Sequence, residues 1–430
     1  LSFLGIGMDP SAAAEWGYDV SRGIADAQAG FWWTGLFPGL AIILLVMGLT
    51  LIGESLNDTF NPVLRRPPYR RAVLPTTPPA ASAPPASSPA ANDLIQVSDL
   101  RVWYGTTRGP VKAVDGVSFQ LAPGETLGLV GESGCGKTTL GRGLLGLLPD
   151  GATRDGEIRF GDRNLLEVTG TEMRGLRGPG LGLIFQEPMT RLDPLMRISE
   201  QFAETLHTHE PDVPDEEVRR RSLEALGSVG IPPTRFDNYP HEFSGGMRQR
   251  IMIALTLVLR PRCIVADEPT TALDVLVEAQ ILSLLSELKA RSGAALLLIT
   301  HNLGIVAEAC DRVAVMYAGR IVEEGPVGEV FARPQHPYTK ALLASTISLS
   351  TQALHFIPGS PPDLVEPPPG CRFHPRCPHA MEVCRQQLPA PIVTAGGSVV
   401  ECWLQIPPEA VPAGGTARLS TKEIAVADEA

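Results

Sequence analysis

The 430-residue sequence lacks an excess of positive charge: it has 36 Lys and Arg against 47 Asp and Glu, a formal net charge of −11. Proteins that bind nucleic acids present a basic face to the phosphate backbone, so this balance argues against nucleic acid as the main partner. The sequence does not lack apolar residues. Because 44% of the residues are hydrophobic, the chain is long and apolar enough for two to three packed domains and is no disordered chain.

Charge is absent altogether from residues 31–52, which begin with three aromatic residues. Such a stretch predicts a transmembrane helix over about 31–53 with an aromatic belt. Acidic residues prevail before it and four arginines follow it, so the positive-inside rule places its C-terminal end in the cytoplasm. A buried soluble helix is the alternative, because Pro38 and Gly39 interrupt the stretch.

Composition divides the chain further. Residues 1–66 contain the apolar helix. They start with an apolar segment without Met, so we expect a truncated chain. Residues 67–92 are rich in Pro, Ala and Ser, which predicts a semi-extended linker. Short apolar strands and helices over 93–334 predict an α/β nucleotide-binding domain. A loop-rich extension follows over 335–406, and we expect the tail, 407–430, to be disordered.

Residues 131–138, Gly-Glu-Ser-Gly-Cys-Gly-Lys-Thr, match the phosphate-loop pattern G-x-x-x-x-G-K-[ST]. Backbone N–H groups of such a loop surround nucleotide phosphates, its Lys reaches the β- and γ-phosphates, and its last hydroxyl ligates Mg²⁺. An apolar strand over 127–130 and a helix over 139–148 are expected on either side. We predict that a nucleoside triphosphate contacts Gly131, Glu132, Ser133, Gly134, Cys135, Gly136, Lys137, Thr138 and Thr139.

Two further apolar strands end in residues with suitable chemistry. Residues 263–266 are followed by Asp267, whose carboxylate can hold Mg²⁺ together with Thr138, and by Glu268, which can act as the base for the attacking water. Residues 295–299 are followed by Thr300 and His301, and an imidazole there can orient the water. A lone His is more often structural, so the role of His301 depends on the family resemblance described next.

Residues 244–246, Ser-Gly-Gly at the start of a predicted helix, offer free N–H groups and a hydroxyl, which predicts a second anion site. With the phosphate loop and the two strand ends, this set resembles the ATP-binding cassette of ABC transporters in residues and in order. The resemblance implies an α/β phosphate-loop ATPase fold with a helical subdomain at about 187–258. It implies that ATP lies between one cassette's phosphate loop and Ser244, Gly245 and Gly246 of a second cassette. Phe243 and Met247 depart from the common L-S-G-G-Q form, which backbone-mediated binding tolerates.

The resemblance also assigns roles to residues that chemistry alone does not single out. Tyr104 lies where the family stacks an aromatic ring on adenine, although an aromatic residue on a strand is as often part of the core. Gln186 is implied as a Mg²⁺ ligand and a catalytic residue, and Asp274 as a nucleotide-binding residue. His301 is implied as a catalytic residue beside Glu268.

Within that family the chain is similar to the dipeptide and oligopeptide importer ATPases, in residues 185–194 apart from Arg191, in 336–339 and in 370–378. Residues 1–7 and 37–42 resemble the end of the matching permeases. The resemblance implies ATP-driven peptide import at the cell (inner) membrane with a cytoplasmic ATPase domain. It implies three partners: a second ATPase subunit, permease subunits and an extracytoplasmic solute-binding protein. Alternatives are another solute such as nickel or a small peptide-like compound, a soluble non-transport ATPase, and a regulatory module without hydrolysis.

Four of the seven cysteines, Cys371, Cys377, Cys384 and Cys402, lie close together in the extension. A cytosolic ATPase module has no disulfide framework, and four thiolates can hold such a segment by binding Zn²⁺ or an iron–sulfur cluster. The spacing lacks the C-x₂-C pairs of zinc fingers, and the resembled subfamily can carry a four-iron four-sulfur (4Fe-4S) cluster here. We expect that cluster, with Zn²⁺ or no metal as alternatives. We expect it to fix the extension without taking part in ATP hydrolysis.

Overall fold

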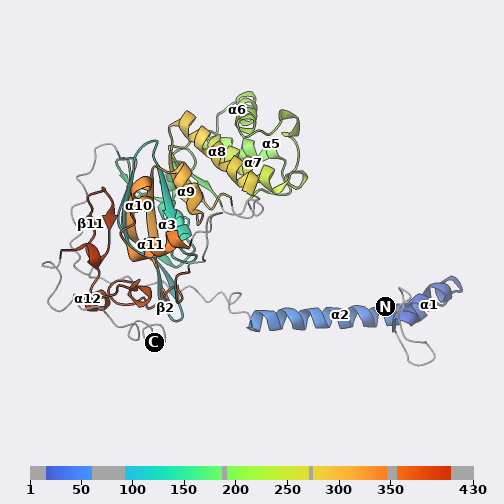
Figure 1. Cartoon of the computed structure of the whole chain (residues 1–430). Helices are drawn as coiled ribbons and strands as arrows, with labels where there is room; N and C mark the ends of the chain where they lie inside the picture. Colours follow the sequence, from blue (N-terminus) through green and yellow to red (C-terminus); the bar gives the residue numbers. More distant parts are fainter. Residues whose placement is uncertain (1–15, 61–92, 186–190, 271–274, 346–355, 408–430) are drawn as a thin grey trace. The chain divides into compact units, whose positions relative to one another are not determined.

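This computed structural model describes residues 16–60, 93–185, 191–270, 275–345 and 356–407 (Figure 1). The chain separates into two compact units, Leu1–Pro68 and Tyr69–Ala430. The expected permease-like start at residues 1–7 lies outside the described residues, and so do the predicted linker and the tail from residue 408 onward.

The first unit contains two helices, α1 (Trp16–Gln28) and α2 (Trp33–Phe60). They approach each other closely at two glycines, because a Cβ atom added to Gly23 would lie 2.3 Å from the Cα atom of Gly35. Within the described residues, Trp33–Leu51 is long and apolar enough to cross a membrane, with a mean hydropathy of 2.1. Pro38 lies near the start of α2 without ending the helix. The predicted apolar helix is therefore present as one continuous element.

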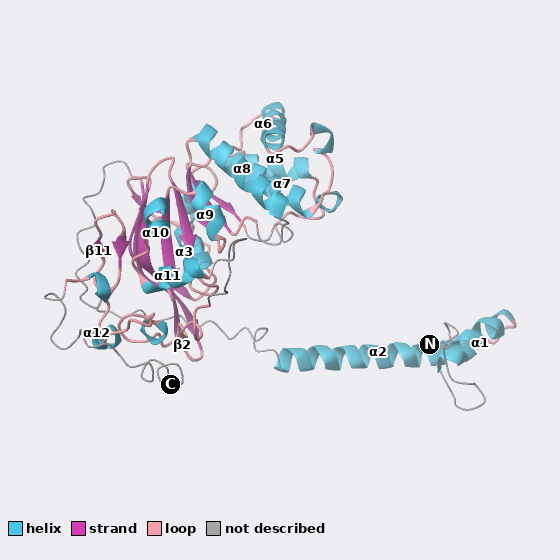
Figure 2. Ribbon diagram, viewed as in Figure 1, coloured by secondary structure: helices cyan, strands magenta, loops and turns pink. Residues whose placement is uncertain are grey.

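The second unit contains an eight-stranded sheet, ordered β11-β12-β10-β9-β3-β8-β7-β6, and a four-stranded antiparallel sheet, ordered β2-β1-β4-β5 (Figure 2). The strands are β1 (Ile95–Thr106), β2 (Gly109–Leu121), β3 (Thr126–Val130), β4 (Ala152–Phe160), β5 (Arg163–Asn164), β6 (Leu181–Ile184), β7 (Cys263–Asp267), β8 (Ala295–Ile299), β9 (Arg312–Tyr317), β10 (Arg320–Pro326), β11 (Ile392–Val393) and β12 (Val399–Val400).

Some helices of this unit lie beside the large sheet, and α5 to α8 form a separate group (Figure 1). They are α3 (Lys137–Leu144), α4 (Gly170–Leu176), α5 (Ile198–His209), α6 (Asp215–Ser228), α7 (Gly245–Leu257), α8 (Val275–Ser292), α9 (Leu303–Ala309), α10 (Val327–Ala332), α11 (Pro337–Ala344) and α12 (Glu382–Gln386). The helix expected over 139–148 is α3, which begins directly after the loop. It ends earlier because Gly146 adopts a left-handed backbone, φ +63°, just past its last turn.

The centre of the large sheet is parallel: β3 pairs with β8 and with β9, β8 with β7, and β7 with β6. Every residue of β3, β7 and β8 is buried. Parallel strands covered on both faces have such continuous apolar sequences. Their C-terminal ends meet at one edge of the sheet, where the predicted site residues follow.

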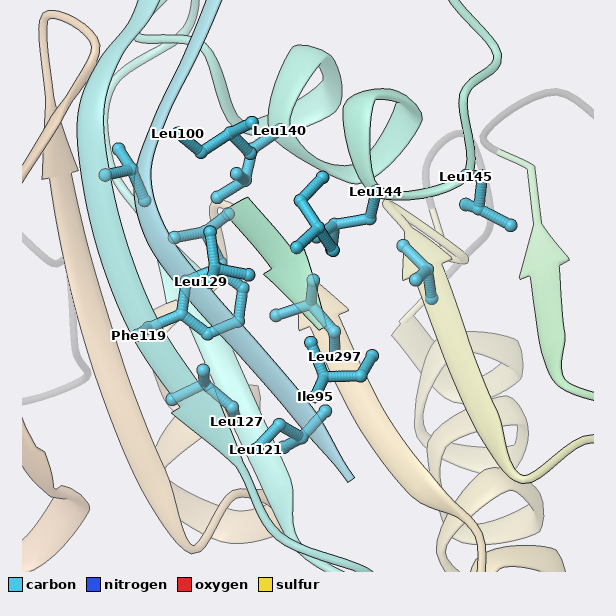
Figure 3. Packing of buried hydrophobic residues seen from close by; sticks show 14 of the residues in the cluster. Ile95, Leu100, Phe119, Leu121, Leu127, Leu129, Leu140, Leu144, Leu145 and Leu297 are labelled. Atoms are coloured by element: carbon cyan, nitrogen blue, oxygen red, sulfur yellow. The ribbon is translucent and has the colours of Figure 1, made fainter. Parts of the chain in front are cut away.

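Alternate residues of these strands enter different hydrophobic cores, as the period of two requires. Leu297 joins the first core, between α3 and the two sheets, while its neighbours Leu296 and Leu298 join a second core with the helical subdomain. Figure 3 shows Leu140 and Leu144 of α3 packed in the first core with the strand residues. Helix α3, which follows the phosphate loop, is thus fixed by packing on both sheets.

The extension continues the large sheet, because β12 pairs antiparallel with β10, with Val400 opposite Glu323. Phe373 shares a third core with Tyr317 and Tyr338. A small fourth core consists of Met381, Val383, Cys384 and Trp403. Packing therefore also holds this segment, since its few large side chains lie against β9, β10 and each other.

Candidate nucleotide-binding site

The loop between β3 and α3 has a backbone that glycine alone accommodates at two points. Gly131 and Gly136 have φ values of +154° and +108°. A Cβ atom would lie 2.1 Å from the carbonyl oxygen of Met316 at Gly131, and 2.0 Å from that of Ala113 at Gly136. Side chains cannot enter either space. The two glycines therefore have the steric role that the motif predicts.

Lys137 opens α3 and is buried, with 6% of its surface exposed. Its Nζ donates to the carbonyl oxygens of Gly131, at 2.8 Å, and Glu132, at 3.1 Å. The ammonium group thus lies within the curve of the loop, at the N-terminus of a helix, where both the charge and the helix dipole favour phosphate. This is the position that the sequence predicts for the residue contacting the β- and γ-phosphates.

Thr138 and Asp267, two of the three predicted Mg²⁺ ligands, lie in contact with each other. The hydroxyl of Thr138 donates to Oδ1 of Asp267 at 2.9 Å. Burial at the end of β7 raises the pKa of Asp267, while the bond from Thr138 and the charge of Arg142 lower it. A hydroxyl and a carboxylate are the hard oxygen ligands that Mg²⁺ prefers. The pair therefore fits a shared ion.

Glu268, which directly follows β7, lies beside His301, which follows the neighbouring strand β8. Nδ1 of His301 is 3.5 Å from Oε1 of Glu268, with the imidazole 63% exposed and the carboxylate 17% exposed. Glu268 has a φ of +45°, and its N–H donates to the carbonyl of Ile299 at the end of β8. Left-handed non-glycine residues are uncommon and gather at functional sites. The backbone therefore holds Glu268 in a strained conformation beside the imidazole.

Tyr104 of β1 donates its hydroxyl to Oγ1 of Thr139 at 3.2 Å, and its ring packs against the first core. It is therefore close to the phosphate loop, and adenine stacking stays a prediction. Gln186 and Asp274 lie outside the described residues.

Ser244 caps α7, where its Oγ accepts a hydrogen bond from the N–H of Met247 at 3.4 Å. Ser244 and Gly245 are exposed. Figure 1 places α7 with α5 and α6 in the helical group, while α3 and the phosphate loop lie beside the sheet. Within this chain the Ser-Gly-Gly segment at 244–246 is therefore separate from the phosphate loop.

Sequence reasoning missed the buried Gln249 of α7, which donates to the carbonyl of Pro269, two residues after Asp267, at 2.6 Å.

The four cysteines of the extension gather in space. Burial is the main cause of the raised pKa of the Cys371 thiol, and the other three cysteines raise it further. Burial likewise raises the pKa of Cys377 to about 12 and that of Cys402 to about 11. Across the part of the chain that the structure describes, no group of three or more His, Cys, Asp or Glu residues is arranged to hold a metal ion. The expected metal centre is therefore not confirmed.

The extension also reaches the phosphate loop, which sequence reasoning missed. The N–H of Glu132 donates to the hydroxyl of Tyr338 at 2.9 Å, and its carboxylate accepts two bonds from Arg376, at 2.7 and 3.0 Å. Both partners lie in the segments that resemble the importer ATPases, but their spacing in the sequence does not reveal a partner in the loop. The extension therefore contacts the phosphate loop directly.

Comparisons with known proteins matched this chain to two family models and to a solved structure. A family model described as ABC transporter matches residues 114–271, and one described as the oligopeptide/dipeptide transporter C-terminal region matches residues 322–384. A solved ATP-binding cassette, a dimer in a post-hydrolysis state bound to ADP and Pi, is 26% identical, with a TM-score of 0.49 over 54% of this chain and 98% of that chain.

Two curated relatives are similar over nearly their whole length. The dipeptide transport ATP-binding protein DppD of Bacillus subtilis is 46% identical over 318 residues, covering 73% of this chain and 95% of the relative. The oligopeptide transport ATP-binding protein OppD of Salmonella typhimurium is 46% identical over 319 residues, with the same coverage of 73% and 95%. The chain therefore belongs to the ABC transporter family, as one of its ATP-binding, ATP-hydrolysing proteins.

Proposed function

We propose that this chain is the ATPase subunit of an importer for dipeptides or oligopeptides. The observation that carries ATP hydrolysis is the adjacency of Glu268 and His301 beside the Thr138–Asp267 pair. The names of the relatives and the match over residues 322–384 support peptides as the solute.

In the proposed reaction, the loop N–H groups and Lys137 bind the β- and γ-phosphates. Thr138 and Asp267 would hold Mg²⁺, joined by Gln186, and the ion supplies neutralisation of the charge on the phosphates. Glu268 accepts a proton from the attacking water, and His301 orients that carboxylate through the contact of 3.5 Å. Tyr104 and Asp274 would contact the rest of the nucleotide.

We propose that a second cassette completes each site. Ser244 and Gly245 are exposed at the N-terminus of α7, away from this chain's own loop, and a helix N-terminus attracts phosphate. The second cassette would place its own Ser-Gly-Gly segment against the ATP held here. Identical or different chains could form the pair.

We propose that α2 spans the cell membrane with its C-terminal end in the cytoplasm, and that residues 1–66 are the C-terminal part of a permease. The apolar length of Trp33–Leu51 and the arginines that follow support this orientation. The remaining partners would be permease subunits and an extracytoplasmic solute-binding protein.

We propose that the four cysteines hold a 4Fe-4S cluster, with Zn²⁺ as the alternative. The thiols influence one another's pKa, which supports a common centre.

The transport proposal predicts that peptide-loaded binding protein stimulates ATP hydrolysis by the assembly reconstituted in vesicles. The measurement compares a dipeptide, a longer peptide and Ni²⁺ as solutes, and counts peptide accumulated inside the vesicles. Uptake and stimulation with Ni²⁺ alone would contradict the peptide assignment while leaving the ATPase intact.

Glu268→Gln should bind ATP normally while turnover falls about 10²- to 10⁴-fold, because a positioned base contributes a factor of that size. Steady-state phosphate release and ATP binding are measured on the same preparation. Glu157→Gln, which changes a partly exposed glutamate on β4, is the matched control and should keep full activity. Turnover of Glu268→Gln equal to that of the control would refute the role of Glu268.

Pairing of cassettes predicts complementation between inactive variants in a homodimer. Ser244→Arg blocks the partner's site and Lys137→Ala disables its own, so in a mixed dimer one composite site carries both lesions and the other carries neither. Each variant alone should be inactive and the mixture partly active. Full activity of a strictly monomeric preparation would exclude the shared site.

Anaerobic purification should yield iron and sulfide in equal amounts, with about four of each per chain as the cluster requires. Replacing Cys384 by Ser should lower both without abolishing ATP binding. Zinc in place of iron would select the alternative, and a metal-free protein with an ordered extension would reject both metals.

A further inference from the structure

Glu132, the second residue of the phosphate loop, has all its polar groups engaged. Its carbonyl oxygen accepts a hydrogen bond from Lys137, which is part of the nucleotide site. Its N–H donates to Tyr338 at 2.9 Å and its carboxylate accepts the two bonds from Arg376. The loop is thus held by Lys137 from inside and by the extension from outside.

The two outer contacts come from segments far apart in the sequence that meet in one aromatic cluster. Ring centroids of Tyr338 and Phe373 lie 4.6 and 5.2 Å from that of Tyr317, and 5.4 Å from each other. The Tyr317 hydroxyl also accepts a bond from Arg376 at 3.2 Å. Packing of this kind leaves the Tyr338 hydroxyl and the guanidinium little freedom to move away from Glu132.

The Arg376 side chain is 3% exposed and that of Glu132 is 23% exposed. A buried ion pair adds little net stability, because desolvation offsets much of the attraction, but a bidentate Arg–carboxylate pair strongly fixes geometry. Without its partner, the carboxylate would leave an uncompensated negative charge in the loop that must accept phosphates. The contact therefore bears on ATP binding more than on folding.

We propose that Arg376 and Tyr338 are positioning residues for ATP: through them the extension holds Glu132, and with it the phosphate loop, in the conformation that accepts the triphosphate. The proposal rests on the proposed binding of ATP by residues 131–138. It gives the extension a direct part in the nucleotide site of its own chain.

The test measures the ATP dissociation constant and the KM and kcat for hydrolysis on the full-length chain in its assembly. Arg376→Met should raise the dissociation constant and KM about tenfold or more, the size expected for lost hydrogen bonds to a charged group, with kcat at saturating ATP changed less than twofold. The KM and dissociation constant of Arg376→Lys should lie between those of the wild type and those of Arg376→Met, because Lys keeps the charge and loses the paired geometry. Tyr338→Phe removes one hydroxyl from an intact ring and should raise KM about threefold to tenfold.

The double variant Glu132→Gln with Arg376→Met separates positioning from the effect of an unpaired charge. It leaves no unpaired carboxylate but also no contact between Arg376 and the loop, so its KM should stay well above that of the wild type. A KM for the double variant equal to that of the wild type would show that repulsion by the carboxylate alone raises KM, and would overturn the proposal.

Arg320→Met is the matched control, since Arg320 also joins the cassette to the extension, through two bonds of 3.1 Å to Glu401. It should lower the melting temperature and leave KM for ATP unchanged. A lower melting temperature of Arg376→Met with an unchanged KM would likewise make that arginine merely structural and reject the proposal.

Lys137→Ala separates a failure of the proposed nucleotide site from a failure of the positioning role alone. If it binds ATP as well as the wild type, the proposed nucleotide site itself fails. If it loses ATP while Arg376→Met and Tyr338→Phe bind ATP normally, the site stands and the positioning role alone is wrong.

Discussion

The backbone of the phosphate loop is the constraint on which the rest of the structure depends. Two of its glycines lie where a neighbouring carbonyl oxygen takes the place of a Cβ atom, and those carbonyls belong to Met316 of β9 and Ala113 of β2. The loop therefore lies between the large sheet, whose centre is parallel, and the small antiparallel sheet. Both sheets and the core between them must form before the N–H groups of the loop can converge on a phosphate.

This constraint explains why much of the site could be predicted from the sequence. A parallel sheet brings the C-terminal ends of its strands to one edge, so residues directly after three apolar runs had to lie close together. Asp267 ends β7, His301 lies two residues after β8, and Lys137 lies at the end of the loop that follows β3. Local pattern and sheet geometry were enough to bring these residues together, while the role of His301 needed the family resemblance.

The unpredicted contacts depend on side chains that meet only after tertiary docking. Glu132 and Arg376 are 244 positions apart, and Gln249 reaches the Asp267 turn from another subdomain. No periodicity or spacing encodes such pairs. The predicted helix after the loop was too long because Gly146 was not recognised as its stop. The packing of Phe373 against Tyr317 of β9 likewise depends on a strand outside the extension.

The short segment from Cys371 to Cys377 contacts both the small sheet and the phosphate loop. Its Arg372 pairs with Asp115 of β2 and donates to the carbonyl of Ala318, and its Arg376 pairs with Glu132. The same segment thus fastens the extension to the small sheet and to the phosphate loop, while two of the four clustered thiols stand at its ends. Arg376 directly precedes Cys377, so a displacement of this thiol would act on the guanidinium beside the loop. With the proposed positioning role of Arg376, order in the extension and affinity for ATP would be coupled through one turn of chain, without a conformational change having to cross the cassette.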